Sequence, residues 1–206
     1  MPDAEPRDDP AKVRFEWVAS FYNALNALVE EFSSKHRKEI LSRVRGNILE
    51  VGVGTGNSFK DYPSGQQIVA IDISEEMLHR AEKKRGDYRG KIELCREDVE
   101  SLSFKDEAFD TIFCSWVFCT VADPVEGLTH LRRVLKKDGQ LLMLEHVRSK
   151  NNIVGYLMDK LNPLVARLGI GNINRDTVHY LRKVGFKIEQ DRNIAYDIVK
   201  AIVASK

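Results

Sequence analysis

Apolar residues along the chain recur with two periods, and their alternation predicts an α/β fold. Short apolar runs typical of buried strands lie at 47–51, 67–71, 91–95, 109–117 and 139–145. Helical patterns, with apolar residues three and four positions apart, separate some of these runs at Glu75–Lys84 and Val125–Lys136. Strands that alternate with helices in this way indicate a parallel sheet with helices packed on both faces.

The C-terminal part of the pattern predicts an antiparallel addition to that sheet. Arg175–Val184 has helical spacing and is closed by Gly185, a residue that commonly follows a helix end. Two further strand-like runs follow at Phe186–Gln190 and Ile194–Val203, close enough together to form a hairpin. We therefore expect seven strands, mostly parallel, with the C-terminal hairpin antiparallel.

Two segments lie outside the predicted sheet. Val13–Phe32 is an aromatic-rich amphipathic helix followed by a charged helical stretch to Arg45, and Val147–Asn174 is an insertion interrupted by Asn162-Pro163. The insertion combines apolar residues with Lys and Arg side chains. This composition suits either a lid helix packed on the core or a surface that dips into a membrane. The predicted organisation is a flexible tail (1–12) and one domain (13–206), made of a helical cap (13–45), a cofactor-binding core (46–146), a lid insertion (147–174) and a C-terminal helix and hairpin (175–206).

Composition narrows the classes of protein. A length of 206 residues with 43% hydrophobic residues suits one domain, and a net charge of +1 indicates no general attraction to nucleic acid or to an anionic membrane, with local patches left open. The three cysteines form no CxxC pair, which favours a reducing compartment and hence a cytoplasmic protein, and predicts no metal site. No apolar stretch reaches the roughly 18 residues of a membrane span, so we expect a soluble chain, with contact to a membrane surface left open.

The residues that follow the first two predicted strands indicate a nucleoside site. Gly52, Gly54 and Gly56 allow a sharp turn and a close approach of the backbone to a ligand, although a tight strand-to-helix turn alone is the alternative. Their spacing differs from the dinucleotide fingerprint G-x-G-x-x-G, and no Gly-Lys-Ser/Thr follows as in a Walker loop. Asp72 directly follows the second predicted strand, where a carboxylate accepts hydrogen bonds from ribose, or else it caps the next helix in competition with Ser74.

Five motifs in order, LEVGVGTG, VAIDIS, REDVESLSF, FDTIFCSWVFCTV and LRRVLKKDGQLLMLEH, resemble those of class I S-adenosylmethionine-dependent methyltransferases. The resemblance covers about residues 46–146. It implies a Rossmann-like sheet, S-adenosylmethionine as cofactor and S-adenosylhomocysteine as product. It places Glu50, Gly52, Gly54 and Gly56 around the methionine end, Asp72 on the ribose, Ile73, Met77, Asp98 and Val99 around the adenine, and Ser115, Trp116 and Val117 at the closing side of the site.

Segments at both ends of the chain bear on the class of substrate. VASFYNALNALVEEFSSKHRKEI is similar to ubiquinone/menaquinone-biosynthesis C-methyltransferases, with Asn23 where that family has Asp, whereas downstream segments are similar to phosphatidylethanolamine N-methyltransferases and methyltransferase-like thiol enzymes. We expect methyl transfer to an apolar or amphipathic small molecule, a quinone-type ring or a lipid headgroup, with a small thiol as an alternative. A nicotinamide-dependent oxidoreductase is a different class of hypothesis, and the glycine spacing disfavours it. RNA is not expected, because no basic patch is interleaved with aromatics.

Catalytic residues are few in this chemistry, because the cofactor carries an activated methyl group and the protein mainly positions the reactants. A general base is needed only when the acceptor arrives protonated. His146, at the end of the fifth strand beside Glu145, and Tyr22, on the N-terminal helix, are the candidates. The alternatives are a strand-end histidine hydrogen-bonded to backbone and a tyrosine packed in the core.

Overall fold

The computed structural model describes residues 30–168 and 171–206, and the chain divides into two units, residues 1–35 and 36–206. In the first unit, residues 30–35 are helical. The predicted tail, most of the predicted Val13–Phe32 helix and Tyr22 lie outside the described residues. The second unit contains all the strands of the sheet.

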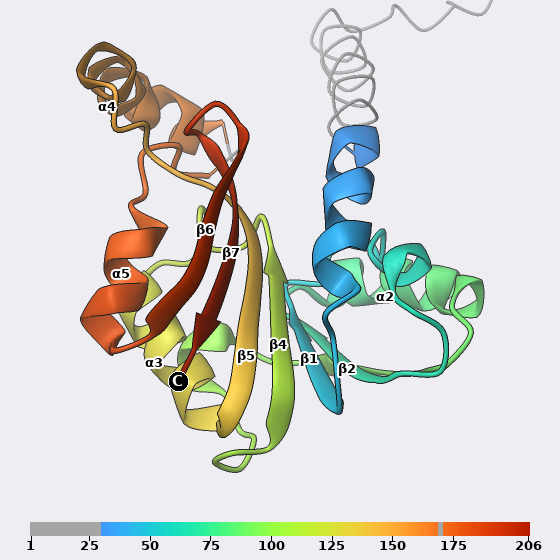
Figure 1. The fold of residues 1–206 in the computed structure, drawn as a ribbon. Coiled ribbons are helices and arrows are strands. Elements are labelled where there is room, and N and C mark those ends of the chain that lie inside the picture. Colours follow the sequence, from blue (N-terminus) through green and yellow to red (C-terminus); the bar gives the residue numbers. More distant parts are fainter. Residues whose placement is uncertain (1–29, 169–170) are drawn as a thin grey trace, which may run out of the picture. The chain divides into compact units, whose positions relative to one another are not determined.

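The second unit is built on one seven-stranded sheet in the order β3-β2-β1-β4-β5-β7-β6 (Figure 1). The first five strands are mutually parallel, and β7 is antiparallel to both β5 and β6. The expected fold class, including the antiparallel C-terminal hairpin, is thereby confirmed. The strands are β1 (Asn47–Val51), β2 (Gln67–Asp72), β3 (Lys91–Arg96), β4 (Phe109–Ser115), β5 (Leu135–His146), β6 (Lys187–Ala195) and β7 (Val199–Ser205).

Helices cover both faces of the sheet. The apolar side chains of α3 and α5 pack on one face together with Val51, Cys114 and Met143. Residues 40–44, η1 and α2 pack on the other face, with Phe113 and Leu142. The helices are α2 (Glu75–Lys84), α3 (Pro124–Val134), α4 (Asn152–Arg167) and α5 (Thr177–Val184), with the short 3-10 helices η1 (Phe59–Asp61), η2 (Arg85–Asp87) and η3 (Val99–Ser101).

The order of strands reverses between β1 and β4. From β1 the chain moves to β2 and β3 on one side, and β4 and β5 lie on the other side. Ligands of open α/β sheets bind outside the carboxyl ends of the strands at such a reversal. The fold therefore directs attention to the residues just after β1, β2 and β4.

The β4–α3–β5 region differs from the predicted boundaries. We expected β4 to reach Val117 and α3 to reach Lys136, but β4 ends at Ser115 and β5 begins at Leu135. Trp116 has a left-handed φ of 60°, which ends the extended backbone there. Leu135 is fully buried opposite Phe109, and the Lys136 ammonium contacts the Asp110 carboxylate of β4 at 2.8 Å. These tertiary contacts draw residues 135–138 into the sheet.

The C-terminal hairpin turns later than its sequence indicates. We placed the turn between Gln190 and Ile194, but β6 continues to Ala195 and the turn lies at residues 196–198. Asp191 and Asn193, which are typical turn residues, point instead to the Lys200 ammonium on β7, at 2.5 and 2.9 Å. Cross-strand pairing therefore satisfies polar groups that in isolation favour a turn.

Helix α4 runs through the proline at which we expected an interruption. Pro163 lies inside α4, which continues to Arg167. The neighbouring Asn162 side chain accepts a hydrogen bond from the Ile173 N–H at 2.8 Å and donates one to Asn172 Oδ1 at 3.1 Å. Contacts with residues 172–173 hold this part of α4 in place despite the missing helical hydrogen bond.

Candidate cofactor-binding site

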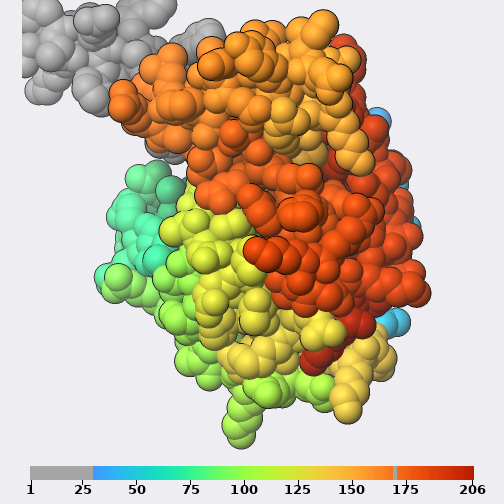
Figure 2. Space-filling view, turned by 90° about the vertical axis from the view of Figure 1, so that its left-hand side faces the viewer, coloured from blue at the N-terminus to red at the C-terminus, as the bar shows by residue number. Residues whose placement is uncertain are grey.

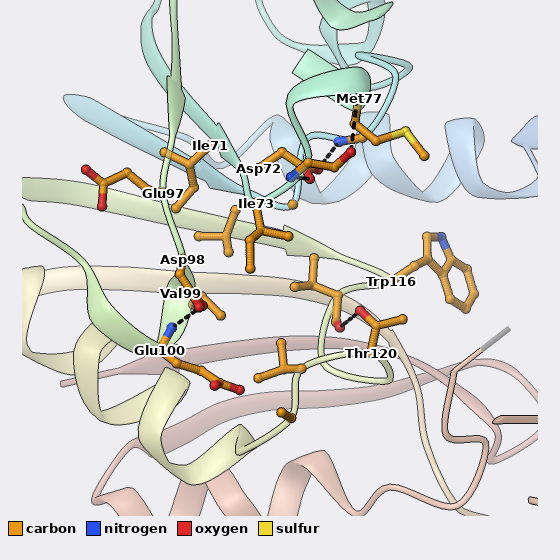
Figure 3. A pocket seen from close by; sticks show the side chains of 17 residues that line it. Ile71, Asp72, Ile73, Met77, Glu97, Asp98, Val99, Glu100, Trp116 and Thr120 are labelled. Carbon is orange, nitrogen blue, oxygen red and sulfur yellow. Dashed lines mark hydrogen bonds between the residues drawn. The ribbon is translucent and has the colours of Figure 1, made fainter. Parts of the chain in front are cut away.

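The carboxyl ends of β1, β2 and β4 enclose a cavity of about 570 Å³ (Figure 3). That volume is in the usual range for a small-molecule site. Nine of the residues assigned to the cofactor from sequence line it together: Gly52, Gly54, Asp72, Ile73, Met77, Asp98, Val99, Trp116 and Val117. Segments more than sixty residues apart in the chain thus meet at the strand-order reversal.

The glycine turn after β1 brings backbone to the cavity wall. Gly52 has a φ of +66°, and a Cβ atom there would lie 2.6 Å from the Val117 side chain. Gly54 has a φ of +55°, and a Cβ atom there would meet nothing within 4 Å. Gly52 therefore permits close packing of two cavity walls, whereas Gly54 keeps the cavity side of the turn open.

The Asp72 carboxylate fixes this turn to the end of β2. Its Oδ2 accepts a hydrogen bond from the Gly54 N–H at 2.8 Å, and its Oδ1 accepts one from the Ser74 N–H at 2.9 Å (Figure 3). Ser74 itself caps α2, because its hydroxyl accepts from the Met77 N–H. Asp72 therefore does not cap α2, and each of its oxygens keeps capacity for a further donor.

The opposite wall of the cavity carries the acids that follow β3. Asp98 caps η3 by accepting a hydrogen bond from the Glu100 N–H at 2.9 Å, and Val99 lies beside it (Figure 3). Ile73 and Met77 extend from the end of β2 and the start of α2, and both are exposed apolar side chains. Apolar surfaces flanked by carboxylates form a slot suited to a flat heterocycle that carries an amino group.

A buried carboxylate holds the loop after β4. Glu145 is fully buried, and its Oε1 accepts hydrogen bonds from the Val117 and Phe118 N–H groups at 3.0 and 3.2 Å. Burial raises the pKa of Glu145 to about 7, while the two N–H donors act in the opposite direction. Because Val117 lines the cavity, the hydrogen bonds to Glu145 hold one of the cavity walls in position.

Three predicted cofactor residues, Glu50, Gly56 and Ser115, do not line the cavity. Glu50 alternates with Val51 along β1, so its side chain lies on the other face of the sheet, where it is almost fully buried. Burial raises the pKa of Glu50 to about 7, against the hydroxyls of Ser58 and Tyr62 and the charge of Arg37, which lower it. A Cβ atom on Gly56 would lie 2.7 Å from the Phe59 ring, so this glycine permits close packing beside the turn.

Unpaired polar atoms gather at the end of β4. Among the described residues, Ser115 Oγ and Trp116 Nε1 are buried and have no hydrogen-bond partner. Figure 3 shows the Trp116 indole at one end of the cavity, directed away from Asp98. Buried polar groups are normally paired, and of these two residues only Trp116 lines the cavity, so its indole N–H is the one available to a ligand there. Roles for Glu50, Gly56 and Ser115 remain predictions.

His146 lies at the same edge of the sheet but does not line the cavity. It is the last residue of β5 and alternates with Glu145, so the two side chains lie on opposite faces. Burial lowers the pKa of His146 below its ordinary value of 6.5. The imidazole is therefore neutral near pH 7 and able to accept a proton.

Other cavity residues were not predicted from the sequence. Thr120, Val121 and Ala122 line the cavity because the chain leaves β4 two residues early and turns back across its end. Glu97 and Glu100 also line it. The sequence contains a signal for this loop. Asp123-Pro124 is typical of a helix start, which leaves residues 116–123 to connect β4 to α3.

The residues present fit the cofactor that the sequence resemblance implies. A carboxylate with spare acceptor capacity suits ribose hydroxyls, the apolar slot beside Asp98 suits an adenine, and the open side of Gly54 leaves room beside the turn. The cavity is therefore complementary to a nucleoside.

Two glycines offer a matched test of the open side of the turn. Gly54 and Gly65 both have left-handed φ values, and a Cβ atom meets nothing within 4 Å at either position, but only Gly54 lines the cavity. Replacing either by alanine is expected to lower the free energy of unfolding by roughly 1–2 kcal/mol. Calorimetric titration with S-adenosylmethionine should show weaker binding, by roughly tenfold, for Gly54→Ala alone. Equal affinities in the two variants would contradict this role of Gly54.

Comparison with known proteins supports a cofactor site of the methyltransferase type. A family model described as a methyltransferase domain matches residues 49–143. Phosphatidylethanolamine N-methyltransferase of Cereibacter sphaeroides is 36% identical over 103 residues, which cover 49% of this chain and 51% of that protein. The ubiquinone/menaquinone biosynthesis C-methyltransferase UbiE of Pseudomonas fluorescens is 30% identical over 184 residues, which cover 82% of this chain and 71% of that protein. The chain thus spans about half the length of the Cereibacter sphaeroides protein.

Solved structures share the fold. The crystal structure of a SAM-dependent methyltransferase from Thermotoga maritima aligns with a TM-score of 0.66 at 22% sequence identity. The alignment covers 91% of this chain and 97% of that one. The agreement therefore extends beyond the central strands to most of the chain.

Proposed function

Because the chain belongs to the S-adenosylmethionine-dependent methyltransferases, we propose that it transfers a methyl group to an apolar or amphipathic small molecule. The acceptor is a quinone-type ring or a lipid headgroup. The observation that carries the proposal is the cavity at the strand-order reversal, in which the glycine turn, Asp72 and the apolar slot meet. A nicotinamide-dependent oxidoreductase is disfavoured by the family and by the glycine spacing.

Binding residues in this proposal have separate tasks. Asp72 holds the ribose. The adenine is enclosed by Ile73, Met77 and Val99, and its amino group donates a hydrogen bond to Asp98. S-adenosylmethionine, when bound, supplies a methyl group already activated on a sulfonium. The chain then has to orient the acceptor and exclude water, and this accounts for apolar walls without a dense acid-base cluster.

A general base is needed only when the methyl acceptor arrives protonated. His146 is proposed for that role, because its lowered pKa keeps the imidazole neutral near pH 7 at the carboxyl end of β5. Tyr22, which lies outside the described residues, remains a second candidate from the sequence alone.

The names of two relatives support an amphipathic methyl acceptor. Their names specify phosphatidylethanolamine and ubiquinone or menaquinone biosynthesis, and both classes combine a polar reacting group with an apolar body. On this chain, the apolar residues Val121 and Ala122 also line the cavity and are not assigned to the cofactor. An amphipathic acceptor buries such surface, whereas a small charged acceptor does not.

A labelled-methyl transfer assay tests the proposal. The full chain is incubated with S-adenosylmethionine and, in separate reactions, a quinol, phosphatidylethanolamine vesicles and a small thiol. We expect transfer to the quinol or to the phospholipid, and much less product from an Asp72→Ala variant at the same concentration of S-adenosylmethionine. Transfer to the thiol alone would overturn the acceptor class. Binding of a nicotinamide dinucleotide in place of S-adenosylmethionine, measured by calorimetry, would overturn the reaction itself.

A further inference from the structure

Helix α4 carries its apolar side chains on the outside. Six of them are each more than half exposed: Ile153, Tyr156, Leu157, Leu161, Leu164 and, at the C-cap, Leu168. At 3.6 residues per turn these positions fall within an arc of about 140° on one side of the helix. Figure 2 shows α4 in light orange along the upper edge of the view, where it forms part of the surface.

The orientation of α4 is fixed from its inner side. Gly155 and Met158 are buried, and a Cβ atom on Gly155 would lie 2.7 Å from the Ser149 carbonyl oxygen. Asp159 on the same side accepts hydrogen bonds from Arg148 at 2.8 Å and from Asn174 at 3.1 Å. The helix is thus held by the buried Gly155 and Met158 and by the hydrogen bonds of Asp159. Rotation of the helix to bury its apolar arc would break these contacts.

Charges on the outer face of α4 are all positive. Lys160 and Arg167 lie on the exposed arc, with the Lys160 ammonium 5.5 Å from the centre of the Tyr156 ring. Lys150 is exposed just before the helix. The one acid of α4, Asp159, is on the inner side and paired with Arg148. Apolar side chains interspersed with cations match the interface of a membrane with anionic headgroups.

We propose that the outer face of α4 docks on the surface of a lipid bilayer that contains anionic lipids. The helix lies in the interface: in the described part of the chain, no helix is long and apolar enough to cross a membrane. A second copy of the chain fits less well, because a symmetric contact through α4 brings Lys160 and Arg167 of both copies together. The inference goes beyond the proposed function, since docking requires neither cofactor nor methyl transfer.

The position of α4 gives docking a consequence for the site. Residues 147–151 connect α4 directly to the carboxyl end of β5, at the edge of the sheet where the cavity lies. Asp197 in the β6–β7 turn reinforces this connection by accepting hydrogen bonds from the Ser149 hydroxyl and the Lys150 N–H. A membrane bound by α4 is therefore attached at the edge of the sheet where the cavity lies.

Vesicle flotation with the full chain tests docking. Phosphatidylcholine vesicles with and without phosphatidylglycerol are compared in the absence of S-adenosylmethionine. The chain should float with the anionic vesicles, and Leu157→Glu with Leu161→Glu should reduce the bound fraction at least about tenfold, because each leucine loses burial in the interface. Lys160→Ser with Arg167→Ser should remove most of the difference between the two vesicle types.

A matched control places the same two negative charges elsewhere. Ser64 and Gln67 are exposed at the amino end of β2, the opposite edge of the sheet from the cavity, so Ser64→Glu with Gln67→Glu should float like the unaltered chain. Calorimetry should give all variants the same affinity for S-adenosylmethionine, which separates docking from cofactor binding. Absence of flotation for the unaltered chain, equal flotation of the leucine variant, or a leucine-dependent dimer without vesicle binding would each overturn the proposal.

Discussion

Replacing Asp72 by alanine is expected to weaken S-adenosylmethionine binding by about 100-fold or more. The carboxylate is proposed to accept from the ribose hydroxyls, and hydrogen bonds to a charged group contribute about 1.5–3 kcal/mol each. About 1.4 kcal/mol corresponds to tenfold in affinity. The same change removes the acceptor of the Gly54 and Ser74 N–H groups, so the glycine turn also loses its attachment to β2. Calorimetric titration measures the effect.

Asp87→Ala is the matched control for Asp72→Ala. Asp87 lies in η2 and is exposed, so the variant removes the same charge from a site away from the cavity. Its cofactor affinity should equal that of the unaltered chain. Thermal unfolding separates loss of the site from loss of the fold. An Asp72→Ala protein that is folded and binds the cofactor normally would refute the assignment of Asp72.

Replacing Glu145 by alanine is expected to have the largest effect on stability. The change leaves the buried Val117 and Phe118 N–H groups without their acceptor and opens a space in the core. Together these effects should lower the free energy of unfolding by about 3 kcal/mol. Glu145→Gln keeps a carbonyl oxygen for both donors and should retain most of the stability. Denaturant unfolding followed by circular dichroism distinguishes the two variants.

Stability of the unaltered chain should also depend on pH through Glu145. Its pKa is about 7 in the folded chain against an ordinary 4.5, so the folded chain binds a proton that the unfolded chain has released. The free energy of unfolding therefore falls as pH rises from about 4.5 to 7, by about 1.4 kcal/mol per pH unit at most. Glu50 contributes in the same direction, whereas the lowered pKa of His146 acts in the opposite one below pH 6.5.

Comparison with Glu145→Gln isolates the contribution of Glu145. The variant cannot release this proton, so its free energy of unfolding minus that of the unaltered chain should rise between about pH 4.5 and pH 7 and be constant above that interval. A difference that does not change with pH would show that Glu145 is not the titrating group.

Features encoded by neighbouring residues were predictable from the sequence. The bounds of α2 match the prediction because Ser74 caps it and Glu75 and Glu76 occupy its first turn, all within a few residues. Gly54 and Asp72 were identified because a motif fixes their types and spacing, and the parallel arrangement of β1 and β2 then brings them within hydrogen-bonding distance.

Features set by distant contacts were not predictable in the same way. The left-handed φ of Trp116 and the loop that brings Thr120 to the cavity depend on Glu145, which is 25 to 29 residues away in the chain. Likewise, Asp191 lies in a strand, where its carboxylate accepts a hydrogen bond from the Lys200 ammonium of β7. Local preferences favoured a longer β4 and an earlier turn, and tertiary pairing overrode both.

The place of β7 in the sheet constrains the order in which the protein assembles during synthesis. β7 lies between β5 and β6, so the antiparallel hairpin joins β5 through its later strand. Until Ser205 has left the ribosome, β5 has an unpaired edge that exposes backbone donors and acceptors along residues 140–146. A nascent chain stalled before that point therefore offers a template for pairing with another chain, and chaperone capture is most needed in that interval.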